Sequence, residues 1–342
     1  MKDAPPPSTD TEATPSVHEA DDGALLSIEG LVVGFETERG IAPAVSGVSL
    51  TVGAGEVVGL VGESGCGKSV TALSVLRLVP SPPSRFLGGR ILWRGEDLLS
   101  MTAKRLREIR GREIAMVFQD PMTALSPLCR IGDQLAETAL VHGGVSRREA
   151  LAIAEEWLGR VGLPEPARRM RDYPHQLSGG MQQRVMIASA LMLDPALVIA
   201  DEPTTALDAA LQAQVLDLMT HTKRAETAVL LITHDMGVVR HAATRVAVMY
   251  AGEIVEEAPA AEFFVAPRHP YAEALLEARP SRVHRVGRLY SIPGSVPSPF
   301  DMPEGCRFAP RCRHAAPECA AKAPELLPCG AGRLCRCLRL AR

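Results

Sequence analysis

The feature that most constrains the fold is a glycine-rich string that lies between an apolar run and a helical pattern. Residues 62–69 read GESGCGKS and fit the pattern G-x-x-x-x-G-K-S. The apolar run 57–61 precedes the string, and a pattern of helical spacing follows from Val70. In this order the three parts form a phosphate-binding loop, because glycines let backbone N–H groups turn inward and the helix N-terminus adds positive potential. The string therefore predicts an α/β fold that binds a nucleotide.

Within this loop, two side chains are expected to act on the phosphates directly. Lys68 should bridge the β- and γ-phosphates, and Ser69 should supply a hydroxyl ligand to Mg²⁺. The expected ATP-binding residues of the loop are Gly62, Glu63, Ser64, Gly65, Cys66, Gly67, Lys68, Ser69 and Val70.

Two later apolar runs also end in polar residues. Residues 197–200 are followed by Asp201 and Glu202, and residues 229–232 are followed by Thr233 and His234. Sites in parallel α/β sheets gather at the carboxyl ends of strands, so these side chains should lie near the phosphate loop. Asp201 is expected to hold Mg²⁺, Glu202 to act as general base, and His234 to contact the γ-phosphate. Gln119, which follows the apolar residues 116–118, is suited to contact Mg²⁺ or water.

Composition limits the other classes of function. The chain has 342 residues, a net charge of −3 and only 4% aromatic residues, which argues against a nucleic-acid partner. No stretch reaches the roughly 18 to 20 apolar residues needed to cross a bilayer. Residues 1–22 lack the apolar core of a signal peptide and read as a disordered tail. We expect a cytosolic chain that serves a membrane only by docking to other subunits.

The remainder of the chain divides into two parts. Residues 121–183 lack a strong strand pattern and contain the helical stretch 147–161, which predicts an inserted helical subdomain. Residues 245–250 and 253–257 flank an Ala-Gly pair and predict a hairpin. Residues 261–342 are rich in proline, which predicts a small irregular C-terminal module that lacks the apolar core to fold without a metal.

One string decides the family resemblance. It presents a hydroxyl and bare N–H groups at a helix N-terminus, and it reads Leu177, Ser178, Gly179, Gly180, Met181 and Gln182. Together with the phosphate loop and the acidic pair, it resembles the signature of the ABC ATPase family. The resemblance implies a P-loop ABC ATPase core with a mixed sheet over residues 23–260. It also implies a head-to-tail dimer, in which ATP lies between the phosphate loop of one subunit and the signature of the other.

The same resemblance assigns further roles. Gln119 matches the Q-loop glutamine, Asp208 the D-loop aspartate and His234 the switch histidine. Phe35 lies in the region of the aromatic residue that stacks on adenine, and a buried core phenylalanine is the alternative. Cys66 is expected only to fill space.

Several strings resemble one branch, the oligopeptide/dipeptide importer ATPases. They are FQDPMTALSP at 118–127, YPHQ at 173–176 and PRHPY at 267–271. This implies an ATPase at the cytoplasmic face of the inner membrane that docks to two permease subunits and pairs with a second ATPase subunit. Its solute, a peptide, would come from an extracytoplasmic binding protein. Nickel chelates or another solute are the alternative, and a soluble ABC ATPase acting on nucleic acid or ribosomes is disfavoured because the chain has one phosphate loop, one signature and no heptad run.

Six of the eight cysteines lie beyond residue 305. In a cytosolic protein this crowding favours a metal site over disulfides. Resemblance to the cysteine motif of the importer branch implies a 4Fe–4S cluster on Cys306, Cys312, Cys319 and Cys337. Zinc or no metal remains an alternative, and Cys335 is an alternative to Cys337. We expect serine substitutions of these four cysteines to destabilise the module and weaken assembly before they affect ATP chemistry, because the nucleotide site lies in the other domain.

Overall fold

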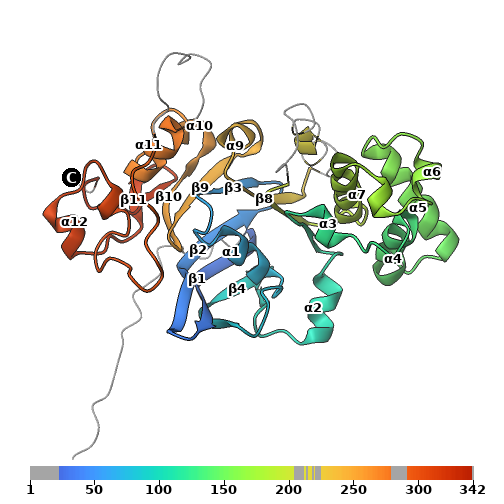
Figure 1. Ribbon diagram of the computed structural model, residues 1–342, viewed down its shortest axis with the longest axis horizontal. Helices are drawn as coiled ribbons and strands as arrows, with labels where there is room; N and C mark the ends of the chain where they lie inside the picture. The colour runs from blue at the N-terminus through green and yellow to red at the C-terminus, as the bar shows by residue number, and fades with distance from the viewer. Residues whose placement is uncertain are drawn as a thin grey trace, which may run out of the picture.

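The computed structural model describes residues 23–203, 212, 215–217, 219, 225–278 and 291–340. Within these residues, a mixed sheet of eight strands runs through the molecule in the order β11-β12-β10-β9-β3-β8-β7-β6 (Figure 1). Its parallel strands are β3 (Val57–Val61), β6 (Ile114–Val117), β7 (Leu197–Asp201), β8 (Ala228–Thr233) and β9 (Arg245–Tyr250). Every residue of β3, β7 and β8 is buried, as expected for parallel strands covered on both faces. The predicted tail 1–22 lies outside the described residues.

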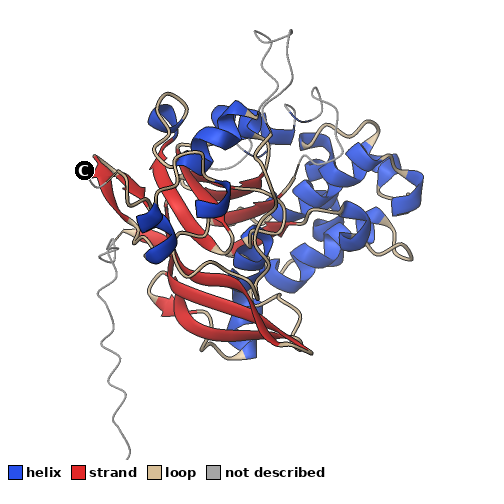
Figure 2. Ribbon diagram, turned by 60° about the vertical axis from the view of Figure 1, so that its left-hand side comes forward, coloured by secondary structure: helices blue, strands red, loops and turns tan. Residues whose placement is uncertain are grey.

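A second sheet is antiparallel and packs against the first (Figure 2). Its order is β2-β1-β4-β5, from β1 (Ala24–Thr37), β2 (Gly40–Gly53), β4 (Ser84–Trp93) and β5 (Glu96–Asp97). One apolar cluster joins Leu26 and Ile28 of β1 to Val58 and Leu60 of β3, with Ala72 of α1 (Lys68–Val75) between them. This contact fixes the sheet of β1 and β2 beside the start of α1.

The segment between β6 and β7 is helical, as predicted. It contains α3 (Pro121–Ala124), α4 (Ile131–Gly143), α5 (Arg147–Arg160), α6 (Pro166–Arg169), a 3₁₀ turn (Pro174–Gln176) and α7 (Gly179–Leu191). Ser146 and Glu149 form a capping box that starts α5. This segment lies at one end of the long axis of the molecule, and the C-terminal module lies at the other (Figure 1). The remaining described helix before β6 is α2 (Ala103–Ile109).

The predicted hairpin is confirmed as β9 and β10 (Glu253–Pro259). Helix α9 (Met236–Ala242) lies between β8 and β9. After β10 come α10 (Ala260–Phe263) and α11 (Pro270–Glu277). The module continues with a 3₁₀ turn (Ala309–Arg311), α12 (Pro317–Ala321), β11 (Leu327–Gly330) and β12 (Arg333–Cys335). The prediction of an irregular module missed β11 and β12, which extend the main sheet by pairing Cys335 and Leu334 with β10.

The module packs on the main sheet through a shared apolar core. Phe308 and Tyr271 pack on Tyr250 of β9, with ring centroids 5.2 and 4.6 Å from that of Tyr250. Tyr250 and Tyr271 are fully buried, and Phe308 is 3% exposed. Burial of such a side chain contributes about 1.5–3 kcal/mol. The module therefore shares a core with the main sheet.

Candidate nucleotide site

The phosphate loop runs from β3 into α1 in a conformation that only glycine allows at two positions. Gly67 has a φ of +106°, and a Cβ there would lie 2.5 Å from the carbonyl oxygen of Ala44. At Gly62 a Cβ would lie 2.2 Å from the carbonyl oxygen of Met249. The glycine at the start of α1 adds no side-chain cap, so the first N–H groups of α1 stay open to an anion.

The side chain of Lys68 folds back onto the phosphate loop. This side chain is buried, and Nζ donates to the carbonyl oxygens of Gly62 at 2.8 Å and Glu63 at 2.9 Å. The ammonium group is therefore held at the concave side of the loop, where phosphates bind in this type of turn.

Ser69 and Asp201 meet beside the loop, as predicted for a Mg²⁺ site. The hydroxyl of Ser69 donates to Oδ1 of Asp201 at 3.1 Å. Burial raises the pKa of Asp201, and the nearby charge of Glu202 adds to this, while the hydrogen bond from Ser69 opposes it. A divalent cation at these oxygens would favour the ionised carboxylate, and hydroxyl and carboxylate oxygens are the ligands Mg²⁺ prefers. The donor set fits the ion.

The three predicted catalytic side chains come together at the ends of β6, β7 and β8. Nε2 of Gln119 donates to Oε2 of Glu202 at 3.4 Å, and Nδ1 of His234 lies 3.3 Å from Oε1 of Glu202. Glu202 has a φ of +47°, a conformation that costs a non-glycine residue about 1–3 kcal/mol and is found most often at functional sites.

The signature string opens α7. Ser178 is the N-cap, and its Oγ accepts from the N–H of Met181 at 3.4 Å. Ser178 and Gly179 are exposed, while Leu177 and Gln182 are buried. Gln182 donates to the carbonyl oxygen of Pro174 at 2.8 Å, which fixes the turn before the signature. The exposed part of the string is therefore open to another molecule.

The sequence predicts two further residues at the nucleotide site, Phe35 and Asp208. Phe35 is partly exposed on β1 and lies opposite Ala42, two residues from Ala44 at the phosphate loop. The predicted D-loop residue Asp208 lies outside the described residues.

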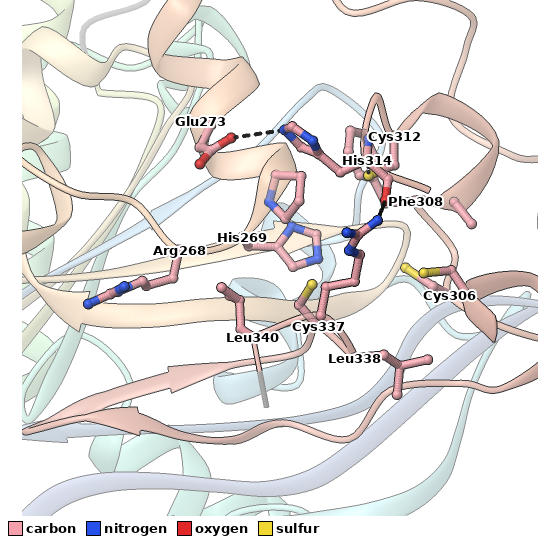
Figure 3. A pocket seen from close by; sticks show the side chains of 14 residues that line it. Arg268, His269, Glu273, Cys306, Phe308, Cys312, His314, Cys337, Leu338 and Leu340 are labelled. Carbon is pink, nitrogen blue, oxygen red and sulfur yellow. Dashed lines mark hydrogen bonds and ion pairs between the residues drawn. The ribbon is translucent and has the colours of Figure 1, made fainter. Parts of the chain in front are cut away.

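The four predicted cluster cysteines line one cavity of about 160 Å³ in the C-terminal module (Figure 3). Cys329 and Cys335 do not line it, and their thiols hydrogen-bond to each other instead. Within the described ranges, no group of three or more His, Cys, Asp or Glu side chains is arranged to hold a metal ion.

The surroundings of this cavity raise the pKa of three of its thiols. Burial raises the pKa of Cys306, Cys312 and Cys337, and the neighbouring cysteines add to the effect. A bound metal would reverse this, because thiolates are the ligating form and are stabilised by a cation.

The structure also shows a contact that sequence reasoning missed. Arg311, from the turn beside Cys312, forms a two-point ion pair with Glu63 of the phosphate loop. Tyr271 of α11 accepts a hydrogen bond from the N–H of Glu63 at 2.8 Å. The nucleotide site and the C-terminal module are therefore in direct contact, although they lie in different parts of the chain. Nothing in spacing could reveal the contact, since the partners are 248 and 208 residues apart.

Both the ATPase part and the C-terminal part of the chain match known protein families. The family described as ABC transporter matches residues 45–205, and the family described as oligopeptide/dipeptide transporter, C-terminal region, matches residues 255–319. A probable peptide ABC transporter ATP-binding protein of Sinorhizobium fredii is 49% identical over 317 residues, which is 92% of this chain and 95% of the relative. The oligopeptide transport ATP-binding protein AppD of Bacillus subtilis is 47% identical over 314 residues, 92% of this chain and 96% of that protein.

Solved structures agree on the fold. The dimeric structure of the bacterial ABC transporter cassette MJ0796 aligns with a TM-score of 0.61 at 28% identity, over 69% of this chain and 98% of that one. A further dimeric structure of that cassette, bound to ADP and Pi, aligns with a TM-score of 0.60. In the described parts of the chain, every helix is too short or too polar to span a bilayer. This chain belongs to the family of ABC transporter ATP-binding proteins that carry the oligopeptide/dipeptide transporter C-terminal region, and it is an ATPase.

Proposed function

We propose that this chain hydrolyses ATP at the cytoplasmic face of the inner membrane to drive import of short peptides. The observation that carries the proposal is identity of 47–49% over 92% of the chain with relatives named as peptide or oligopeptide transporters. In this proposal residues 23–260 form the ATPase domain and residues 261–342 form the importer-type extension. An extracytoplasmic binding protein delivers the peptide, so the peptide does not contact this chain.

Residues at the strand ends divide the work of hydrolysis. Lys68 and the N–H groups of α1 bind the phosphates, and Ser69, Asp201 and Gln119 would hold Mg²⁺, which neutralises phosphate charge. Glu202 takes a proton from water as the water oxygen bonds to the γ-phosphorus. The bond from that phosphorus to the bridging oxygen breaks, and ADP leaves with the electron pair. Gln119 and His234, which flank the carboxylate of Glu202, keep it oriented toward this water.

A second ATPase subunit completes the site. Ser178 and Gly179 are exposed at the N-terminus of α7, where a hydroxyl and free N–H groups can bind the γ-phosphate of ATP held by a partner. Two subunits placed head-to-tail would each receive a signature from the other, with Asp208 at the interface. The partner is a second copy or a homologous subunit. Phe35 would stack on the adenine.

Two permease subunits would dock on the helical segment. A groove of about 390 Å³ runs between β6 and α4, with Phe118, Leu125 and Val141 among its lining residues. Met122, Leu128 and Val141 of this region are 73%, 86% and 67% exposed. Apolar side chains exposed together favour a protein partner. Gln119 lies directly after Phe118, so a permease helix in this groove would sense the nucleotide site.

The cysteine cavity would hold a 4Fe–4S cluster, with zinc as the alternative. Cys306, Cys312, Cys319 and Cys337 line one cavity, and soft thiolates are the ligands of such clusters. The thiols of the described residues are not grouped as a ligand set, so they would have to move toward one another to hold the cluster. The cluster would supply a covalent cross-link among three separate segments of the module.

The test is ATP hydrolysis by the complex purified with two permeases. The expected result is stimulation by peptide-loaded binding protein and none by empty binding protein. Stimulation by a nickel chelate, and not by peptide, would place the solute in another class while leaving the ATPase role intact. Failure to co-purify with any permease would overturn the transport role.

A further inference from the structure

Arg311 joins the C-terminal module to the phosphate loop. Its Nη1 and Nη2 donate to the two carboxylate oxygens of Glu63, at 2.6 and 3.0 Å. Its Nε donates to the carbonyl oxygen of Pro293 at 2.8 Å, and its guanidinium lies 5.8 Å from the ring centroid of Tyr250. The side chain is only 4% exposed. The side chain of Glu63 is 29% exposed. This two-point, charge-assisted pair fixes both the place and the orientation of Glu63.

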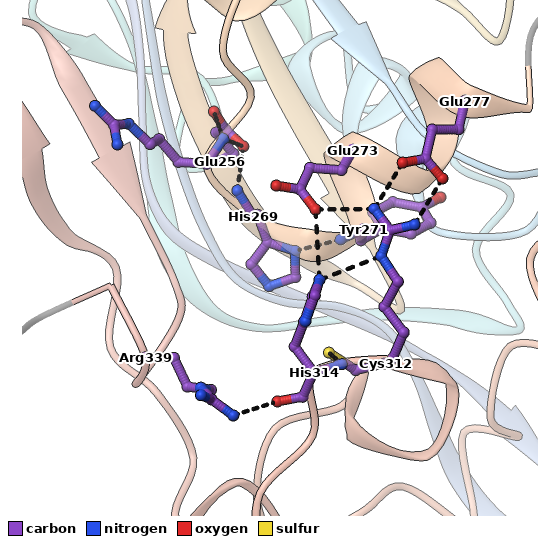
Figure 4. Close-up of polar contacts among 10 residues, drawn as sticks. Glu256, His269, Tyr271, Glu273, Glu277, Cys312, His314 and Arg339 are labelled. Atoms are coloured by element: carbon purple, nitrogen blue, oxygen red, sulfur yellow. Dashed lines mark hydrogen bonds and ion pairs between the residues drawn. The ribbon is translucent and has the colours of Figure 1, made fainter.

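Tyr271 holds the backbone of the same residue. Its hydroxyl oxygen accepts from the N–H of Glu63 at 2.8 Å, and its ring packs against the rings of Tyr250 and Phe308. Figure 4 shows Tyr271 on α11. Glu63 is therefore held at its side chain by Arg311 and at its backbone by Tyr271.

Glu63 also contacts Lys68, the lysine of the nucleotide site. The carbonyl oxygen of Glu63 accepts from Nζ of Lys68 at 2.9 Å. Displacement of Glu63 would move that carbonyl and the first N–H groups of the loop. A binding loop that is already in its bound shape loses less entropy when the ligand arrives, which raises affinity.

We propose that Arg311 and Tyr271 are positioning residues for ATP, which hold Glu63 so that the phosphate loop is shaped for phosphates before ATP binds. ATP affinity then depends on the C-terminal module. The turn that carries Arg311 lies between Cys306 and Cys312, so the cysteine cavity and the phosphate loop are linked by one short segment. The inference rests on ATP binding alone and not on the transported solute.

The experiment measures the Kd of the full-length protein for a fluorescent ATP analogue, and the KM and kcat of the permease complex. Arg311→Met and Glu63→Gln should each weaken binding about tenfold, the typical effect of losing one charged hydrogen-bonded pair. The double variant should bind no more weakly than either single variant, because both changes remove the same ion pair. KM for ATP should rise about tenfold, with kcat changed less than about twofold. Arg311→Lys, which keeps the charge, should recover part of the affinity.

Arg313→Met is the matched control. Arg313 also pairs with carboxylates, those of Glu273 and Glu277, which Figure 4 shows on α11, but its side chain is 41% exposed. This variant should bind ATP like the wild type.

Two results would overturn the proposal: wild-type ATP affinity in folded Arg311→Met, or losses that add in the double variant. If Arg311→Met does not fold, the ATP affinities of Glu63→Gln and Tyr271→Phe test the proposal instead. Tyr271→Phe keeps the ring and removes only the hydroxyl, so weaker binding by both variants supports the proposal, and unchanged binding by both overturns it.

Discussion

Nδ1 of His234 lies 3.3 Å from Oε1 of Glu202, while Gln119 donates to the other oxygen of the same carboxylate at 3.4 Å. The side chain of Glu202 is 15% exposed and that of His234 is 62% exposed, so the carboxylate is sheltered and the imidazole faces outward. A base held from both sides is oriented before water arrives, and an exposed histidine is free to reach a γ-phosphate.

The first prediction concerns this base. Glu202→Gln should retain ATP affinity within about twofold and lower kcat roughly a hundred- to ten-thousand-fold, because the amide keeps the size but cannot take a proton. ATP should then hold two subunits together, which size-exclusion chromatography would detect. Glu155→Gln, on the exposed face of α5, is the control. Near-normal hydrolysis by the Glu202 variant would show that another group is the base.

The second prediction concerns the signature. Ser178→Arg should abolish hydrolysis in the complex and leave the nucleotide affinity of the isolated subunit unchanged, because Ser178 is exposed for a partner's ATP. Ser146→Arg is the control: Ser146 is the N-cap of α5, so that variant also loses a cap, worth about 1 kcal/mol, without touching the signature. A large loss of affinity in the isolated Ser178 variant would mean that the signature contacts ATP in its own subunit.

The third prediction concerns the cysteine cavity. Protein purified without air should be brown and contain close to four iron and four sulfide per chain. Serine at Cys306, Cys312, Cys319 or Cys337 should each remove the colour. Cys329→Ser should retain it, because Cys329 lies outside the cavity. A colourless chain with one zinc would replace the cluster by zinc, and a metal-free chain with a folded module would exclude both.

The fourth prediction concerns the shared aromatic core. Phe308→Ala should destabilise the module by about 3–5 kcal/mol, because it removes a buried ring between Tyr250 and Tyr271. Limited proteolysis and thermal unfolding would report the loss. Val265→Ala is the control, since Val265 belongs to the same module and is 84% exposed. Equal resistance of both variants to protease would show that the core does not anchor the module.

The parallel part of the fold could be predicted because its signals are local. The runs that became β3, β7 and β8 are short, apolar and bounded by polar residues, and each ends where a site residue begins. Likewise Ser146 and Glu149 mark the start of α5 within four residues of chain. Such patterns depend on burial of one segment and can be recognised without knowing its neighbours.

The parts that sequence reasoning missed depend on distant partners. β11 and β12 are strands because β10 offers an open edge, and Cys335 pairs with Glu256 across 79 residues of chain. Arg311 reads as one arginine among many until the fold brings it to Glu63. In the sequence, Tyr271 is recognisable only as part of a family string, and its hydroxyl contact to the phosphate loop has no signature in the surrounding residues.

The most direct test of the account is peptide uptake into proteoliposomes that contain this chain, its permeases and its ATPase partner, with binding protein and ATP added on their proper sides. Uptake of a radiolabelled short peptide should require ATP and should be lost in Glu202→Gln, while the Glu155→Gln control transports normally. Uptake that continues in the Glu202 variant, or ATP hydrolysis by the wild type that moves no peptide, would contradict the account.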